Sequence, residues 1–174
     1  MCPEQMKIIY SDHSSDDKKC FAIKKYWCTF VKMALLMQKF SIEKTRTTPE
    51  IKFSPDENIF SISGISSPED VRAIYYPVIE WTKIFVDDII EGAVKIYSRE
   101  NPVRLHIDLS YFNSSSAKFL FDIITELKRL SAANVPLVVE WLHDEEDTDL
   151  KEAGADISQL VGMEFMYVPK PKIQ

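Results

Sequence analysis

One stretch of the sequence, from residue 103 to residue 130, limits the possible folds more than any other. Its first part has the alternating apolar residues of a strand with one buried face: Val103, Leu105, Ile107 and Leu109. Asn113 and three consecutive serines follow, and then apolar residues with helical spacing: Leu120, Ile123, Ile124, Leu127 and Leu130. Because Asn and Ser favour helix N-caps, the pattern predicts a strand, a short turn and a helix that begins near Ser114.

Ser114 is the residue of most interest in this stretch. Its predicted position is the positive end of a helix at the carboxyl edge of a strand, where an added phosphate is electrostatically favoured. A phosphate brings about −1.5 to −2 charge, and Lys118, one turn onward, can neutralise part of it. The simpler alternative is that Asn113 and Ser114 only cap the helix. The residues alone leave a regulatory switch and an ordinary cap both open.

The segment before this stretch predicts a β-hairpin and a helix. Residues 51–53 and 59–65 are short apolar segments joined by a turn, which indicates two antiparallel strands. Ser67, followed by Pro68, has the residue types of a helix start, and helical spacing then continues to Ile89. Pro77 lies inside this run, so we expect the helix to kink or restart there.

The second half of the chain alternates strands with helices. We predict strands at 103–109, 136–141 and 164–168, a helix from Ser114 to about Ala133, and a last helix at 150–161. The order is therefore β-β-α-β-α-β-α-β. Strands that alternate with helices pair in parallel through crossover connections.

The strand patterns also predict an open face of the sheet. His106, Asp108 and Glu140 each fall between apolar neighbours, so the polar positions share one face. The fold class is α/β, with about five strands in a single mixed sheet and helices mainly on the other face. Trp81 and Trp141 are expected to anchor the core.

Composition excludes several classes of function. The net charge is −6, and residues 37–174 carry 23 Asp/Glu against 15 Lys/Arg, so nucleic-acid binding is disfavoured. All three cysteines lie within the first 28 residues and form no CxxC pair, which argues against a disulfide framework or a zinc site and favours the cytoplasm. Walker, dinucleotide, zincin and kinase motifs are absent, so no cofactor or nucleotide is expected.

Residues 1–40 are predicted to be an N-terminal extension, disordered or loosely helical. Its apolar part, 26–37, is interrupted by Lys32 and is too short and too charged for a membrane span. Three interpretations remain: an amphipathic docking helix, a weak membrane-surface anchor, or translated upstream sequence with the true start at Met33 or Met37. We favour the last. Residues 41–169 form the predicted domain and 170–174 a short tail.

Several motifs together resemble one known family. They occur in this order: Thr48-Pro49-Glu50-Ile51, Ile62-Ser63-Gly64, Pro68-Glu69, Tyr76-Pro77-Val78-Ile79-Glu80-Trp81, the run from Leu109 to Lys118, Trp141, Asp144, Asp147 and Glu152-Ala153-Gly154. Over about residues 42–168 the chain resembles the SiaC-type bacterial regulators, small phosphoproteins related to the STAS domain of anti-sigma-factor antagonists. The resemblance implies the STAS-like fold that the strand pattern also predicts.

The resemblance implies a function as well. In that family a Thr or Ser that opens the central helix accepts a phosphate, and Ser114 occupies the matching position. The implied protein is a non-catalytic phosphoprotein of a partner-switching pathway. An ATP-dependent serine/threonine kinase modifies it, and a PP2C-type phosphatase reverses the modification. The resemblance further implies that the unmodified form binds and activates a diguanylate cyclase, which raises cyclic di-GMP and favours biofilm.

The surroundings of Ser114 supply the expected contact residues. Tyr111 and Phe112 are placed in the turn, where they either pack inward or anchor a partner. Asn113, Ser115 and Ser116 shape the turn and, with Lys118, surround the phosphate.

The acidic run at 144–149 is a second candidate at the same edge of the sheet. It fails the calcium-loop pattern, because Asp149 stands where Gly is needed and Ala155 where Glu is needed. We interpret it as an acidic helix start in which Asp144 and Asp147 are possible partner contacts. His143 is expected to be a surface histidine.

Two competing functions stay open. One is a constitutive adaptor that uses the same edge but is never modified. The other is a serine hydrolase built on His106, Asp108 and Ser114. The hydrolase is disfavoured, because His106 and Asp108 point from the same face of one strand and no Gly-x-Ser-x-Gly elbow surrounds the serine.

Overall fold

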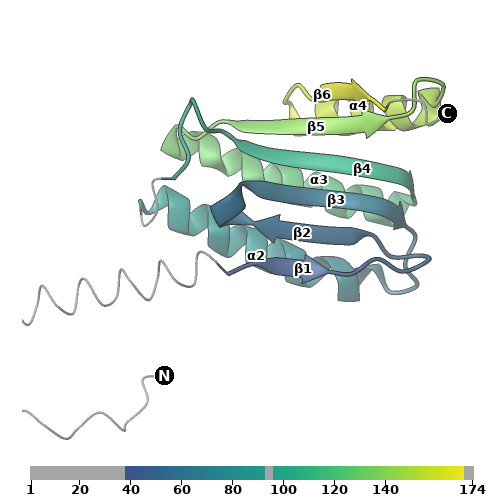
Figure 1. Cartoon of the computed structure of the whole chain (residues 1–174), viewed down its shortest axis with the longest axis horizontal. Helices are drawn as coiled ribbons and strands as arrows, with labels where there is room; N and C mark the ends of the chain where they lie inside the picture. Colours follow the sequence, from purple (N-terminus) through teal and green to yellow (C-terminus); the bar gives the residue numbers. More distant parts are fainter. Residues whose placement is uncertain (1–37, 93–95, 171–174) are drawn as a thin grey trace, which may run out of the picture.

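The computed structural model describes residues 38–92 and 96–170 and shows an α/β fold (Figure 1). A six-stranded sheet has its strands in sequence order, β1-β2-β3-β4-β5-β6. Helices α2, α3 and α4 lie behind one face of this sheet, and no helix covers the other face in the part of the chain that is described (Figure 1). The predicted class and the one-sided arrangement are confirmed, although the sheet has one strand more than predicted.

The N-terminal part of the sheet is antiparallel. β1 (Phe40–Ile42) pairs with β2 (Glu50–Ser54), and β2 pairs with β3 (Ile59–Ser66) through the short helix η1 (Pro55–Glu57). The predicted hairpin is thus confirmed. β1 was not predicted, because three residues are too few to show an alternation. It begins within the predicted extension, whose residues 1–37 lie outside the described part of the chain.

The rest of the sheet is parallel, as predicted. β4 (Val103–Phe112) pairs with β3, β5 (Leu137–His143) with β4, and β6 (Met166–Pro169) with β5. The crossovers contain α2 (Val71–Ile90), α3 (Ser114–Lys128), which continues as the 3-10 helix η2 (Arg129–Ala133), and α4 (Thr148–Val161).

The core lies between the sheet and the helices. Alternate strand residues and the inner faces of the helices are buried there, including Ile62, Leu105, Ile107, Leu120 and Ile124. On the opposite face the polar positions of β4 and β5 stay partly exposed and carry ion pairs. His106 Nδ1 lies 2.9 Å from Glu140 Oε2, and Asp108 pairs with Lys170. This confirms the polar face.

The start of α2 differs from the prediction. Asp70, and not Ser67, is the N-cap, and its carboxylate accepts the N–H groups of Arg72 and Ala73 at 3.1 Å each. Ser67 instead donates its backbone N–H to the carbonyl of Thr47 at 2.8 Å, which holds it in the preceding loop. Pro68 therefore precedes the helix.

Pro77 does not make the helix restart. α2 continues through Pro77 from Val71 to Ile90. Both Pro77 and Ala73, whose carbonyl loses its usual partner, are exposed. Water can therefore satisfy that carbonyl, and the helix tolerates the proline.

Helix α4 is fixed to the sheet through Trp141. This side chain is 1% exposed and its indole N–H donates to the carbonyl of Leu150 at 3.0 Å. A Cβ added at Gly154 would lie 2.7 Å from the indole ring, so only glycine permits this approach. Trp141 is the predicted core anchor. Trp81 is only partly buried, beside the rings of Phe40 and Phe53 at the margin of the core.

The helices within residues 38–92 and 96–170 contain no stretch of the length and hydropathy needed to cross a membrane.

Candidate functional site

A β-bulge shapes the end of β4. Leu109 pairs with Gly64, but Tyr111 pairs with Ile65, so Ser110 is an extra residue in β4. Gly64 has φ of 96° at this point, and its carbonyl accepts the Ser110 hydroxyl at 3.2 Å. The bulge reverses the alternation of the strand, so that Tyr111 lies on the open face and Phe112 on the core face.

The two aromatic residues are therefore strand residues and not turn residues, which corrects the prediction. Tyr111 is 55% exposed on the open face beside Ile65, which is 40% exposed. Phe112 packs inward, with its ring edge-on to Trp141 at 5.8 Å between centroids. Of the two alternatives in the sequence, Phe112 packs inward and Tyr111 is available to a partner.

The helix start is close to the prediction. Asn113 is the N-cap of α3, and its side-chain oxygen accepts the N–H of Ser116 at 2.8 Å. Its own N–H donates to the carbonyl of Ser66 at 3.0 Å. Ser114 is the first residue of the helix and is exposed. Among the residues that the structure describes, none is hydrogen-bonded to its hydroxyl.

The three consecutive serines have different environments. Ser114 and Ser115 are exposed, whereas Ser116 is fully buried. The Ser116 hydroxyl donates to the carbonyl of Ser66 at 3.1 Å and accepts from the Ser66 hydroxyl at 2.9 Å. The Ser66 hydroxyl in turn lies 2.7 Å from that of Tyr75, and burial raises the pKa of Tyr75. Ser116 thus holds α3 against β3 and α2. Its full burial corrects the prediction that it belongs to the surface around the phosphate.

Lys118 lies one turn after Ser114 and is exposed, as predicted. Its ammonium group pairs with Asp122 and lies 5.6 Å from the ring centroid of Phe119. A phosphate on Ser114 would have to compete with Asp122 for this cation. The prediction did not include Asp122, although its spacing of four residues from Lys118 is the signal of such a pair.

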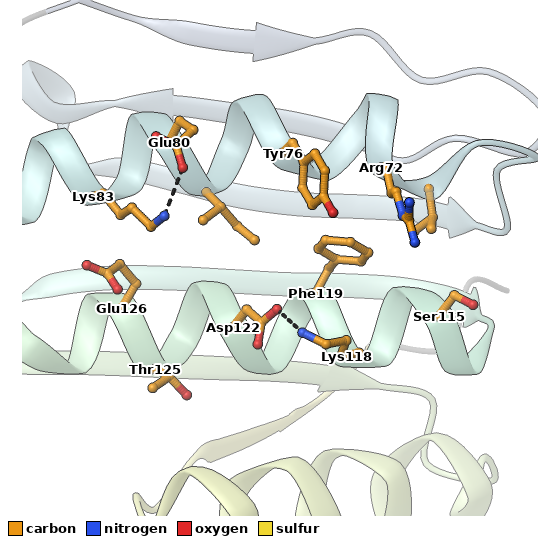
Figure 2. A pocket seen from close by; sticks show the side chains of 12 residues that line it. Arg72, Tyr76, Glu80, Lys83, Ser115, Lys118, Phe119, Asp122, Thr125 and Glu126 are labelled. Atoms are coloured by element: carbon orange, nitrogen blue, oxygen red, sulfur yellow. Dashed lines mark hydrogen bonds and ion pairs between the residues drawn. The ribbon is translucent and has the colours of Figure 1, made fainter.

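A groove runs between α2 and α3 beside this helix start (Figure 2). Its volume is about 740 Å³, and Ser115 and Lys118 line it from α3 while Arg72 and Tyr76 line it from α2. This groove was not predicted, because its two walls come from segments far apart in the chain and neither carries a motif.

The loop between β5 and α4 lies at the same carboxyl edge of the sheet (Figure 1). Asp147 is the N-cap of α4 and accepts the N–H of Leu150 at 2.9 Å. Asp144 is exposed, and its carbonyl accepts the N–H of Asp147 at 3.0 Å. The predicted acidic helix start is confirmed, and no cluster of metal-binding side chains occurs in 38–92 or 96–170.

His143 is not a surface residue, contrary to the prediction. It is 6% exposed, and its ring lies edge-on to Tyr167 at 6.5 Å between centroids. Its Nδ1–H donates to the carbonyl of Asp144 at 2.9 Å. Burial follows from pairing with β6, which covers the end of β5 and places Lys170 N–H on the His143 carbonyl.

The residues of the hydrolase alternative are not brought together. His106 contacts Glu140 and Asp108 contacts Lys170, both on the open face of the sheet. Ser114 begins a helix on the other side of the sheet. The contacts of His106 and Asp108 thus connect them to groups other than Ser114.

Two sequence comparisons find relatives of this chain. A family model described as SiaC family regulatory phosphoprotein matches residues 42–170. An uncharacterised protein of Pseudomonas aeruginosa strain UCBPP-PA14 is 25% identical over 123 residues, which are 71% of this chain and 90% of that protein.

Solved structures share the fold. The crystal structure of apo-SiaC from Pseudomonas aeruginosa matches with a TM-score of 0.62 and 24% identity over 75% of this chain and 98% of that one. A chain in the crystal structure of the diguanylate cyclase SiaD in complex with its activator SiaC, from the same organism, matches with a TM-score of 0.63 and 24% identity, covering 75% and 99% of the two chains.

Proposed function

Because the chain belongs to the SiaC family of regulatory phosphoproteins, we propose that Ser114 is reversibly phosphorylated and that this modification controls which protein binds at the edge around it. The observation that carries the proposal is the position of the Ser114 hydroxyl. It is exposed at the first residue of α3. Asn113, directly before it, caps the helix, and the buried Ser116, two residues after it, anchors the helix.

The chemistry requires two other enzymes. A serine/threonine kinase transfers the γ-phosphoryl group of ATP: a bond forms between Ser114 Oγ and the phosphorus, the bond to the bridging oxygen breaks, ADP leaves and the hydroxyl proton is released. A PP2C-type phosphatase then hydrolyses the ester with water. The protein itself supplies no catalytic group to either step, and the proposed pathway operates in the cytoplasm, where ATP is available.

The phosphate suits this position because its charge is not opposed there. The first turn of α3 contains no acidic residue, and its free backbone N–H groups favour an anion. The modification adds about two negative charges beside Tyr111, Ser115 and Lys118 without requiring the domain to refold. It therefore acts through electrostatics and steric exclusion at a docking surface.

The proposed effector is a diguanylate cyclase, bound by the unmodified form. The solved complex of SiaC with the diguanylate cyclase SiaD supports this choice, since the chain matched in that complex has the same fold as the present chain. The exposed pair of Tyr111 and Ile65 offers apolar contact area on the open face, where β3 and β4 end at the same edge of the sheet as Ser114. Asp144 is a further contact candidate on the adjacent loop.

Co-expression with the kinase tests the proposal. Phosphate-affinity electrophoresis should show a slower band for the wild type, and Ser114→Ala should abolish it. Ser131→Ala, at an exposed serine in η2, should keep the slower band. A wild type that stays unmodified would favour the constitutive adaptor instead. Binding of the purified cyclase should be lost on phosphorylation of the wild type and retained by Ser114→Ala.

A further inference from the structure

We propose that the groove between α2 and α3 receives an amphipathic α-helix of the effector, with an acidic residue of that helix bound by Arg72. This inference rests on the proposed function and names the surface that the effector would use.

The groove has the dimensions of a helix-binding site. Its lining residues extend from Val71 to Lys83 on α2 and from Ser115 to Glu126 on α3. About twelve residues of helix correspond to roughly 18 Å, or about three turns. Both helices begin at the same end of the groove, so the walls run side by side over this length (Figure 2). An additional helix laid between two helices is a common recognition mode.

The middle of the groove is apolar. Tyr76 is 53% exposed, a large fraction for an aromatic side chain, and its ring lies edge-on to Phe119 at 5.7 Å between centroids. Ile79 is partly buried beside them. These three side chains form a floor against which the apolar face of a partner helix can pack.

Among the described residues, the charged side chains that line the groove form ion pairs, with the exception of Arg72. Lys83 pairs with Glu80, and Lys118 pairs with Asp122. Arg72 lines the groove as well, but within residues 38–92 and 96–170 its guanidinium group forms no ion pair. Figure 2 shows Arg72 projecting from the first turn of α2 at the end where Ser115 lies. A carboxylate on the partner helix would complete this end of the groove.

Phosphorylation of Ser114 would release the partner because Ser114 lies near the end of the groove that contains Arg72. Ser115 lines the groove, and Ser114 is its chain neighbour. A phosphate on Ser114, which precedes the groove residues of α3, adds negative charge at this end of the helix pair, where the partner's carboxylate would lie. The two anions repel each other and compete for Arg72 and Lys118. An amphipathic helix with an acidic residue is thus bound in the unmodified state and excluded in the modified one.

Two variants on α2 form a matched test with the purified, unphosphorylated chain and the purified cyclase. Tyr76→Ala should weaken binding by about 30-fold, as expected for loss of a central aromatic anchor. Ile84→Ala is the control, because Ile84 is 58% exposed on the same helix but does not line the groove. Its affinity should stay within about twofold of the wild type.

Arg72→Glu tests the charge. It should weaken binding by about tenfold or more, and a Glu→Arg or Asp→Arg change in the cyclase helix should restore affinity. Thermal unfolding of each variant checks that the fold is kept.

Equal binding by the wild type, Tyr76→Ala and Arg72→Glu would overturn the groove assignment and leave the proposed function intact. A dimer of the wild type that Tyr76→Ala dissociates without loss of cyclase binding would assign the groove to a second copy and also overturn it. No binding by the wild type would reject the proposed effector itself, and with it the occupant named here.

Discussion

Helices α3 and α4 begin at the same edge of the sheet and are capped in the same way, but their electrostatic surroundings differ. The cap of α3 is the neutral Asn113, and its first turn contains no acidic residue. The cap of α4 is Asp147, followed by Asp149 in the first turn. The positive end of α4 is therefore already compensated by carboxylates, whereas that of α3 is not. Of these two helix starts, only that of α3 leaves the charge of a phosphate unopposed.

The first test of this comparison concerns α4, whose role we interpret as structural. Gly154→Ala should lower the free energy of unfolding by about 1–3 kcal/mol, because the added Cβ would press on the ring of Trp141. The same substitution in an unconstrained helix stabilises by about 0.5–1 kcal/mol. The sign of the change in the free energy of unfolding, measured in urea, therefore shows whether the contact with Trp141 constrains α4. A stabilised variant would show that α4 is not fixed by this contact.

A smaller change in the free energy of unfolding should distinguish two neighbouring serines at the start of α3. Ser116→Ala should cost about 1–2 kcal/mol of unfolding free energy, since it removes two buried hydrogen bonds with Ser66. Ser115→Ala should change it by less than about 0.5 kcal/mol, as for most exposed positions. The measurement is chemical unfolding of both variants. Equal effects would mean that the buried hydroxyl does not anchor the helix start.

The parts of this edge that the sequence predicted are those set by local interactions. The helix start near Ser114, the exposure of Ser114 and the acidic start of α4 all depend on residues within one turn of each other. Local propensity is sufficient to specify them.

The parts that were missed depend on contacts between distant segments. The bulge at Ser110 appears only in the register of β4 against β3. α2 is capped by Asp70 and not by the predicted Ser67, whose backbone N–H is hydrogen-bonded to the carbonyl of the distant Thr47. Nor does a pattern in either helix indicate that Arg72 and Ser115 share a groove.

The most direct test, with the smallest expected effect, places the same charge at the first residue of both helices. Ser114 and Thr148 are equivalent, exposed first positions of α3 and α4. Ser114→Asp should raise the thermal midpoint by about 1–2 °C, because the carboxylate meets an uncompensated helix end. Thr148→Asp should give no increase, because Asp147 and Asp149 flank it and repel the added charge.

Scanning calorimetry at low and high salt measures both variants. The gain for Ser114→Asp should shrink as salt screens the interaction. Equal gains for the two variants would show that the acidic residues of α4 do not distinguish the helices. The preference of a phosphate for the start of α3 would then have to come from recognition by the kinase and not from the field of the protein itself.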